Sequence, residues 1–274
     1  MKQTIKFFTF FSMLALFAIT FGCESSSPNK NIANKTINTN QNNSGVAAAL
    51  ALYKNAPPGA QPPNMLGSPT ASVTVEEFAD FQCPSCAQVH TIMKSVQSTY
   101  GNRIKFIYRH FPLNQMHKNA YDASLAAESA GEQNRFWDMQ NQLFTSQKEW
   151  STSTDVRPIF VGYAQKMGLD VPKFQSDMLS LATKKQVDED IQRGTALKLD
   201  STPSIYINGK SVAFQQLNLE AIRAIIDAEL QNAGNSQSQP AQPTLPANNT
   251  AVNSGNTAVN TGNAPNTAKS PANK

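Results

Sequence analysis

Two stretches with almost nothing to bury enclose one segment that can form a core, and this division limits the fold to the middle of the chain. Residues 24–45 are mostly Asn, Ser, Thr and Lys, and the residues from Gly234 onward are mostly Asn, Ala, Thr, Pro, Ser and Gln. Such segments bury too little apolar surface to offset the entropy lost on ordering. We therefore expect a disordered Asn/Pro-rich tether over 23–65, one folded domain over 66–233 and a disordered tail over 234–274.

The N-terminus has the features of an export signal. Lys2 and Lys6 precede an apolar run from Phe7 to Gly22. This run is shorter than the roughly 20 residues that a membrane-spanning helix needs. We expect residues 1–22 to be a signal peptide and the chain to act on the periplasmic or cell-envelope side.

Cys23 directly follows this run and precedes a Glu-Ser-Ser-Ser stretch. The arrangement resembles a bacterial lipoprotein signal, in which the cysteine is acylated, although Thr20 and Phe21 stand where Leu and a small residue are usual. Lipidation of Cys23 would anchor the chain to a membrane. The alternative is ordinary signal cleavage, which leaves Cys23 as a free thiol or removes it.

The folded segment has an alternating pattern of strand-like and helical periodicity. The Asn208-Gly209 pair lies between two short β-prone runs and predicts a hairpin. Gly101 is a natural helix stop, and Asn218 is a plausible N-cap for the last helix. The predicted order is a strand ending near Cys83, a helix over 84–100, a strand over 103–111, a helical section over about 115–198, the hairpin and a final helix.

The motif Cys83-Pro84-Ser85-Cys86 stands where the first strand meets the first helix. Unpaired amides and the positive end of the helix dipole would stabilise a thiolate on Cys83. Pro84 suits an early helical position because it has no amide hydrogen to leave unpaired. Cys86 lies one turn further and can close onto Cys83. We therefore predict a redox pair in which Cys83 attacks and Cys86 resolves.

A zinc site and a structural disulfide remain open as alternatives to a redox pair. Half of a zinc site would need two more ligands, but the chain has only three cysteines, and its three histidines form no pair at ligand spacing. A purely structural disulfide would close too short a loop to restrict the unfolded chain much. We expect no metal and no organic cofactor, because the cysteines themselves carry the electrons.

The run from Glu77 to Cys86, the helical section and the run from Ser201 to Gly209 together resemble the DsbA-like family of bacterial envelope thiol–disulfide oxidoreductases. The resemblance covers about residues 64–233 and implies an α/β thioredoxin fold with an inserted all-helical subdomain. It also implies that Pro203 is a cis-proline beside the redox pair.

The resemblance further implies that Thr202, Pro84 and Ser85 contact the substrate, and that Glu77 is a buried acid that modulates proton transfer. An exposed strand carboxylate is the alternative for Glu77. Because neighbouring strand residues point to opposite faces, we expect only one of Glu76 and Glu77 to point inward, and we favour Glu77.

The histidines and tryptophans of this region have simpler interpretations. We expect His90 to be a solvated helix residue. We expect His110 and His117 to be structural or surface residues, and Trp137 and Trp150 to pack the helical insert.

We conclude from the sequence that the chain is a monomeric oxidase that introduces disulfides into exported thiol proteins, with a quinone-linked membrane protein as electron acceptor. A formal charge of +4 without a dense basic run does not indicate nucleic-acid binding. A reductase or isomerase on the same fold is one alternative. A non-catalytic binding or chaperone lipoprotein is another.

Overall fold

The computed structural model describes residues 39–237 of the chain, with side chains from Ser44 to Asn235. The expected signal peptide, Cys23, the first part of the tether and most of the tail lie outside the described residues. The chain divides into two compact units, and the second, which starts at Ala48, contains the sheet and the candidate site. Among the described residues, no helix has the length and apolar character needed to cross a bilayer.

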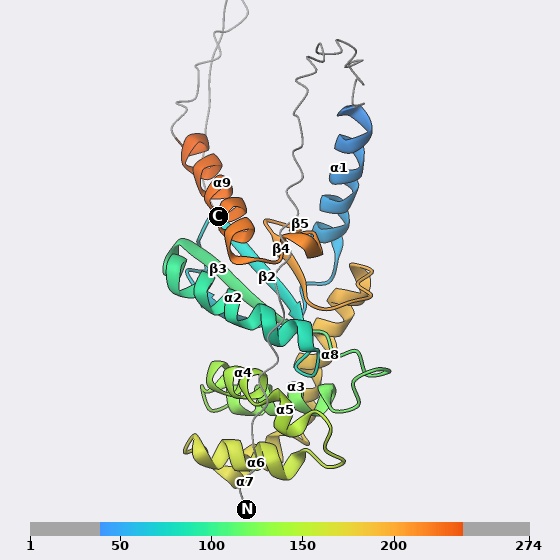
Figure 1. Ribbon diagram of the computed structural model, residues 1–274, viewed down its shortest axis with the longest axis vertical. Helices are drawn as coiled ribbons and strands as arrows, with labels where there is room; N and C mark the ends of the chain where they lie inside the picture. Colours follow the sequence, from blue (N-terminus) through green and yellow to red (C-terminus); the bar gives the residue numbers. More distant parts are fainter. Residues whose placement is uncertain (1–38, 238–274) are drawn as a thin grey trace, which may run out of the picture. The chain divides into compact units, whose positions relative to one another are not determined.

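A five-stranded mixed sheet forms the centre of the second unit (Figure 1), and its strands lie in the order β1-β3-β2-β4-β5. Strands β2 and β3 are parallel, and every other neighbouring pair is antiparallel. This arrangement confirms the predicted α/β class. The strands are β1 (Asn64–Gly67), β2 (Val73–Ala79), β3 (Ile104–His110), β4 (Ser204–Ile207) and β5 (Lys210–Ser211).

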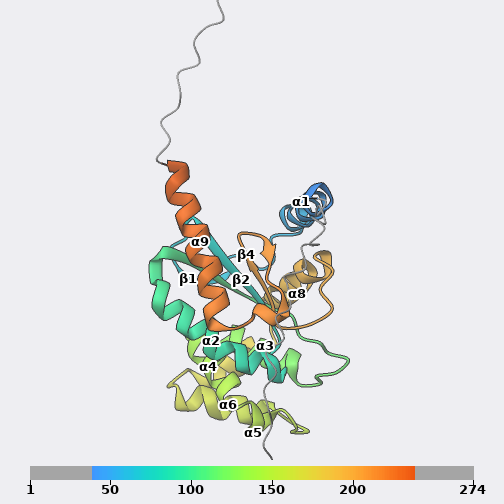
Figure 2. The ribbon, with the colours of Figure 1, turned by 45° about the horizontal axis from the view of Figure 1, so that its top comes forward.

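The central strand β2 is covered on both faces. Six of its seven residues are buried, and only Thr74 is partly exposed. Helices α2 (Pro84–Tyr100) and α9 (Leu219–Gln237) cover one face, and α8 (Leu181–Ala196) packs on the other beside β3 (Figure 2). Strands buried on both faces are usually nearly continuous apolar runs. β2 departs from this pattern at Glu76 and Glu77.

The predicted helical insert is present between β3 and β4. Trp150 is completely buried within it, donates from its ring nitrogen to the carbonyl of Leu143 and meets the ring of Phe160 edge-on. Trp137 packs against the same core, so both tryptophans are packing residues as expected. The helices are α3 (Ala120–Gly131), α4 (Phe136–Thr145), α5 (Gln147–Trp150), α6 (Arg157–Lys166), α7 (Val171–Asp177) and α8.

The turn and cap residues act as the sequence predicts. Asn208 and Gly209 have φ values of +48° and +77° and connect β4 to β5. Such left-handed pairs match the twist of a tight hairpin. Gly101 ends α2 with φ +49°, and the Asn218 side chain accepts a hydrogen bond from the amide of Ala221 at the start of α9.

The prediction of a disordered tether over 23–65 is wrong for residues 39–65. Helix α1 covers Thr39–Asn55, and β1 begins before the expected domain start at 66. The intervening segment is held by backbone contacts: the carbonyls of Pro57, Pro58 and Ala60 accept hydrogen bonds from arginine side chains. The polar, proline-rich composition of the segment does not predict this order. The segment between α1 and β1 is held by Arg109 and Arg193, which lie far away in the sequence.

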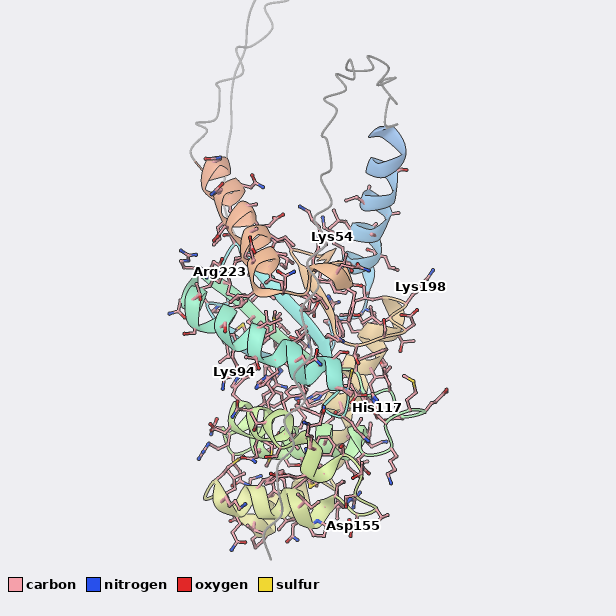
Figure 3. All side chains as sticks on the ribbon, in the orientation of Figure 1. Lys54, Lys94, His117, Asp155, Lys198 and Arg223 are labelled. Carbon is pink, nitrogen blue, oxygen red and sulfur yellow. The ribbon has the colours of Figure 1, made fainter. Side chains whose placement is uncertain are left out.

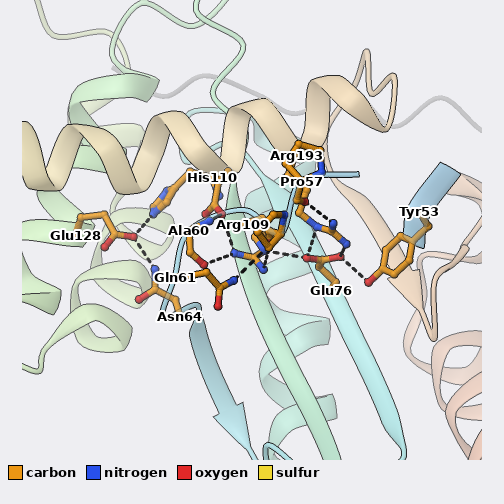
Figure 4. Close-up of polar contacts among 12 residues, drawn as sticks. Tyr53, Pro57, Ala60, Gln61, Asn64, Glu76, Arg109, His110, Glu128 and Arg193 are labelled. Atoms are coloured by element: carbon orange, nitrogen blue, oxygen red, sulfur yellow. Dashed lines mark hydrogen bonds and ion pairs between the residues drawn. The ribbon is translucent and has the colours of Figure 1, made fainter. Parts of the chain in front are cut away.

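Both glutamates of β2 are buried, so the expectation that only one would point inward is also wrong. Each is only 1% exposed, on opposite faces of a sheet that has no solvent-facing side at this point. Glu76 lies in a buried ionic cluster (Figure 4), where its carboxylate accepts hydrogen bonds from Arg109, Arg193 and the hydroxyl of Tyr53 at 2.6–2.9 Å. Arg109 also pairs with Asp190 of α8 at 2.8 Å.

The ionic cluster keeps Glu76 charged. Burial opposes its ionisation, but hydrogen bonds and charge from Arg193, together with the charge of Arg109, lower its pKa below the usual value. A group with a lowered folded-state pKa stabilises the fold above its unfolded pKa, and this contribution is lost as the pH falls through the folded-state value. The cluster should therefore weaken on acidification.

Replacing Glu76 with Gln should lower the free energy of unfolding by about 3–5 kcal/mol, because it leaves two buried guanidinium groups without their carboxylate. Urea denaturation at neutral pH measures this change. The matched control is Glu132→Gln at an exposed position, which should change stability by less than about 0.5 kcal/mol. Equal effects of the two substitutions would show that the cluster does not stabilise the fold.

Candidate active site

The two cysteines of the motif occupy the first turn of α2. Cys83 is the N-cap residue in an extended conformation, and Pro84 follows as the first helical residue. Cys83 is 7% exposed and Cys86 is completely buried. Both are free thiols in this structure. Cys83 is therefore the sulfur that an incoming molecule can reach.

The environment divides the two thiols into a stronger and a weaker acid. Hydrogen bonds from the Cys86 side chain, and then from backbone amides of Cys86 and Ser85, lower the pKa of Cys83 to about 5 against the opposing effect of burial. Burial and the neighbouring Cys83 raise the pKa of Cys86 well above its ordinary value. Near neutral pH the pair therefore holds one thiolate, on Cys83.

The peptide bond between Thr202 and Pro203 is cis, as the resemblance implied. The Cys83 thiol donates to the carbonyl of Thr202 at 3.4 Å, which joins two segments that are 119 residues apart in sequence. Pro203 and Thr202 are buried, Pro84 is exposed and Ser85 is partly exposed. The structure thus brings together the residues that the sequence singled out around the redox pair.

The helical insert is tied directly to this turn through Gln147, a residue that no sequence motif identifies. Its side-chain amide donates to the carbonyls of Phe81 and Cys83 at 2.7 and 2.9 Å. Gln82 makes a second link, because it donates to the carbonyl of Ser151 and accepts from the amide of Asn119. No spacing in the sequence signals these contacts, since they connect distant segments.

The histidines are structural, but one lies in an unexpected place. His90 was expected to be solvated; instead it is buried, stacks on Phe144 and bonds to Asn141 at 3.2 Å. The prediction failed because α4 covers this side of α2.

The other two histidines are bonded to carboxylates. His117 bonds to Asp80 at the end of β2. His110 bonds to Glu128, as shown in Figure 4. Figure 3 shows His117 at the edge of the folded unit.

Glu77 is buried on the sheet face that carries Cys86, and its Oε1 atom has no hydrogen-bond partner among the described residues. Burial raises its pKa to about 8. The hydroxyl of Tyr108, on the neighbouring strand, is also buried without a partner. An unpaired buried polar group costs about 1–3 kcal/mol, so two of them side by side point to a role beyond packing.

Within residues 39–237, no group of three or more His, Cys, Asp or Glu side chains is arranged to hold a metal ion. The chemistry that the described site offers is that of its thiols, its backbone amides and the buried carboxyl of Glu77.

The acid–base asymmetry of the two thiols can be measured directly. In the reduced protein, thiolate absorbance at 240 nm should rise with a midpoint near pH 5, and Cys83→Ser should remove this transition. Because Cys83 has a lowered pKa, it stabilises the reduced fold above its unfolded pKa, and the contribution is lost as the pH falls through about 5. A midpoint near the ordinary thiol value of about 8.5 would contradict the assignment.

Comparison with solved structures supports the fold. BdbD from Bacillus subtilis, in its oxidised form, is 24% identical and superimposes with a TM-score of 0.56, covering 64% of this chain and 98% of that chain. The alpha-DsbA1 protein of Wolbachia pipientis is 18% identical with a TM-score of 0.56, covering 65% and 96% of the two chains.

A curated relative shows that a similar sequence also occurs within a longer protein. The Na(+)/H(+) antiporter NhaA 1 of Mycolicibacterium gilvum is 36% identical over 146 residues, which are 53% of this chain and 23% of the antiporter. This chain therefore spans about a quarter of that relative, and the similarity concerns one segment of it.

A family model described as thioredoxin matches residues 60–228, which is more than half of the chain and includes the sheet, the motif and the helical insert. The chain therefore belongs to the thioredoxin family, and its fold is the DsbA-like form with an inserted helical subdomain.

Proposed function

We propose that the protein is a thiol–disulfide oxidase that introduces disulfides into exported proteins. The observation that carries this proposal is the contrast between Cys83, whose pKa is lowered to about 5, and the buried Cys86, whose pKa is raised. A stabilised thiolate favours the reduced form of the pair, so the oxidised form tends to accept electrons. The fold of thiol–disulfide oxidoreductases supports the same chemistry.

The reaction starts from a Cys83–Cys86 disulfide. A substrate thiolate attacks the Sγ atom of Cys83, the Cys83–Cys86 bond breaks, and Cys86 leaves as a thiolate that takes up a proton. A second substrate thiolate then attacks the substrate sulfur of the mixed disulfide and releases Cys83 as a thiolate. The substrate has lost two electrons, and the enzyme pair has gained them.

The geometry suits each role in this sequence. Cys83 is the partly accessible sulfur, and its low pKa makes it the better leaving group when the substrate disulfide closes. Cys86 is out of contact with solvent and reacts only with Cys83. The backbone around Thr202 and the cis-proline Pro203 lies against Cys83, where it can pair with an extended substrate segment. Pro84 and Ser85 follow Cys83 directly and are accessible to the same substrate.

Turnover requires an electron acceptor, and we propose a quinone-linked membrane protein. Acylation of Cys23 would hold both proteins on one membrane surface and raise their effective concentration. We propose that the enzyme acts there as a monomer on thiol-containing exported proteins.

A reductase is the second candidate, and one feature favours it. The residue between Pro84 and Cys86 is Ser85, which carries no charge, and the described histidines are bonded elsewhere, His90 to Asn141 among them. Thiolate stabilisation at Cys83 therefore depends on hydrogen bonds without a neighbouring cation, which limits how oxidising the pair can be.

Incubation of the oxidised protein with a reduced, unfolded protein that carries two cysteines tests the proposal. The substrate should gain its disulfide as the enzyme gains two thiols, and Cys83→Ser should abolish the transfer. Cys86→Ser, started as a mixed disulfide of Cys83 with glutathione, should exchange with the substrate to form a linked species, which the second substrate thiol then resolves. Transfer that persists in Cys83→Ser would refute the mechanism, and an inert wild-type pair would favour a non-catalytic binding protein.

A further inference from the structure

Two buried polar groups lie next to each other on the sheet face beneath the redox pair. Glu77 of β2 and Tyr108 of β3 are direct partners in the parallel register of the two strands. Parallel partners point to the same side of a sheet, and this side carries Val75 and Phe106, which belong to the same core cluster as Cys86. Neither Glu77 Oε1 nor the Tyr108 hydroxyl has a hydrogen-bond partner among the described residues.

The Tyr108 ring is enclosed by other rings. Those of Phe81, His110 and Phe136 pack against it at centroid distances of 5.3–5.7 Å. His110 bonds to Glu128 through its Nε2 atom. The Tyr108 ring is therefore held in place by packing, while its hydroxyl keeps a free donor and a free acceptor among the described residues.

Burial, and then the charges of Glu77, Cys86, Asp80 and Asp190, raise the pKa of the Tyr108 hydroxyl above its ordinary value. Asp80 already accepts hydrogen bonds from the amides of Gln82 and Leu113 and from His117, and Asp190 accepts from Arg109 and from backbone amides. Among the described residues, Glu77 at Oε1 and His110 at Nδ1 are the ionisable groups near this ring that keep a buried atom without a partner. Cys86, which is hydrogen-bonded to Cys83, gains and loses a proton in the proposed reaction.

We propose that Tyr108 is a positioning residue that relays a proton between Glu77 and Cys86 through bridging water, because its hydroxyl bonds directly to neither group among the described residues. This inference rests on the proposed function and specifies its proton path. Tyrosine suits the position because one hydroxyl can donate and accept at the same time.

Protons balance in both directions of the reaction. When a substrate thiolate opens the Cys83–Cys86 disulfide, the Cys86 sulfur takes a proton from a bridging water, the water takes one from the Tyr108 hydroxyl, and that hydroxyl regains one from the Glu77 carboxyl. When Cys86 later attacks a mixed disulfide on Cys83, the same protons return, and Glu77 is protonated again. Tyr108 is neutral before and after each step.

Tyr108→Phe separates this role from packing. The substitution keeps the ring and removes one unpaired hydroxyl, so a role in packing alone predicts unchanged or greater stability and unchanged kinetics. A relay predicts that the rate at which Cys86 resolves the mixed disulfide falls about 10²-fold. Glu77→Gln should slow the same step to a similar extent, and the double variant should be no slower than either single variant, because both changes break one path.

The experiment follows reaction of the reduced protein with glutathione disulfide by stopped-flow between pH 5 and 10. The resolving rate of the wild type should depend on the ionisation of Glu77, and Tyr108→Phe should remove that limb of the pH profile while the thiolate titration of Cys83 stays in place. Tyr206→Phe is the matched control, because Tyr206 packs on the opposite face against Phe78 and should leave the profile unchanged.

The outcomes separate the two proposals. A Tyr108→Phe profile that coincides with the wild type, or additive effects of Tyr108→Phe and Glu77→Gln, would overturn the relay and leave the oxidase proposal intact. A wild-type pair that does not react with glutathione disulfide would overturn both.

Carboxyl carbon NMR of Glu77 adds a readout that does not depend on turnover. Loss of the Tyr108 hydroxyl in Tyr108→Phe should raise the Glu77 pKa. An unchanged Glu77 titration would contradict an interaction between Glu77 and Tyr108.

Discussion

Burial of β2 on both faces governs how this domain is built. The strand carries two consecutive glutamates, and a buried charge is costly unless it is paired or neutralised. The structure uses both solutions. Glu76 keeps its charge because Arg109 and Arg193 pair with it, whereas burial raises the pKa of Glu77 to about 8. One strand therefore carries a paired carboxylate on one face and, on the other, a buried carboxyl with a raised pKa.

The ionic cluster around Glu76 explains why the folded domain extends further toward the N-terminus than the sheet requires. Arg109 and Arg193 have donors left over after binding Glu76, and the carbonyls of Pro57, Pro58 and Ala60 accept from them. Tyr53 adds its hydroxyl to the same carboxylate (Figure 4). The segment before β1 thus completes the ionic cluster and is part of the domain.

The sequence was sufficient for the features that depend on local patterns. The strand–helix junction at Cys83, the hairpin at Asn208-Gly209 and the caps at Gly101 and Asn218 each follow from neighbouring residues, and the structure confirms them. The cis bond before Pro203 was inferred from resemblance to a family and is present.

The features that the sequence could not supply depend on distant partners. The order of residues 39–65 requires arginines on β3 and α8, burial of His90 requires α4, and the contact of Gln147 with the Cys83 carbonyl requires the insert to fold back on the motif. The hydroxyl of Tyr108 becomes a candidate only when the register places it beside Glu77.

The reduction potential of the Cys83/Cys86 pair is the most informative quantity to measure, because an oxidase requires that the fold stabilise the thiolate of the reduced pair. Equilibration of the protein with a glutathione redox buffer gives this value. Reference potentials are about −120 mV for the strong oxidase DsbA and about −270 mV for thioredoxin. We predict a value above about −180 mV, the potential of protein disulfide isomerase. A value below about −240 mV, close to that of thioredoxin, would contradict the oxidase proposal and identify a reductase.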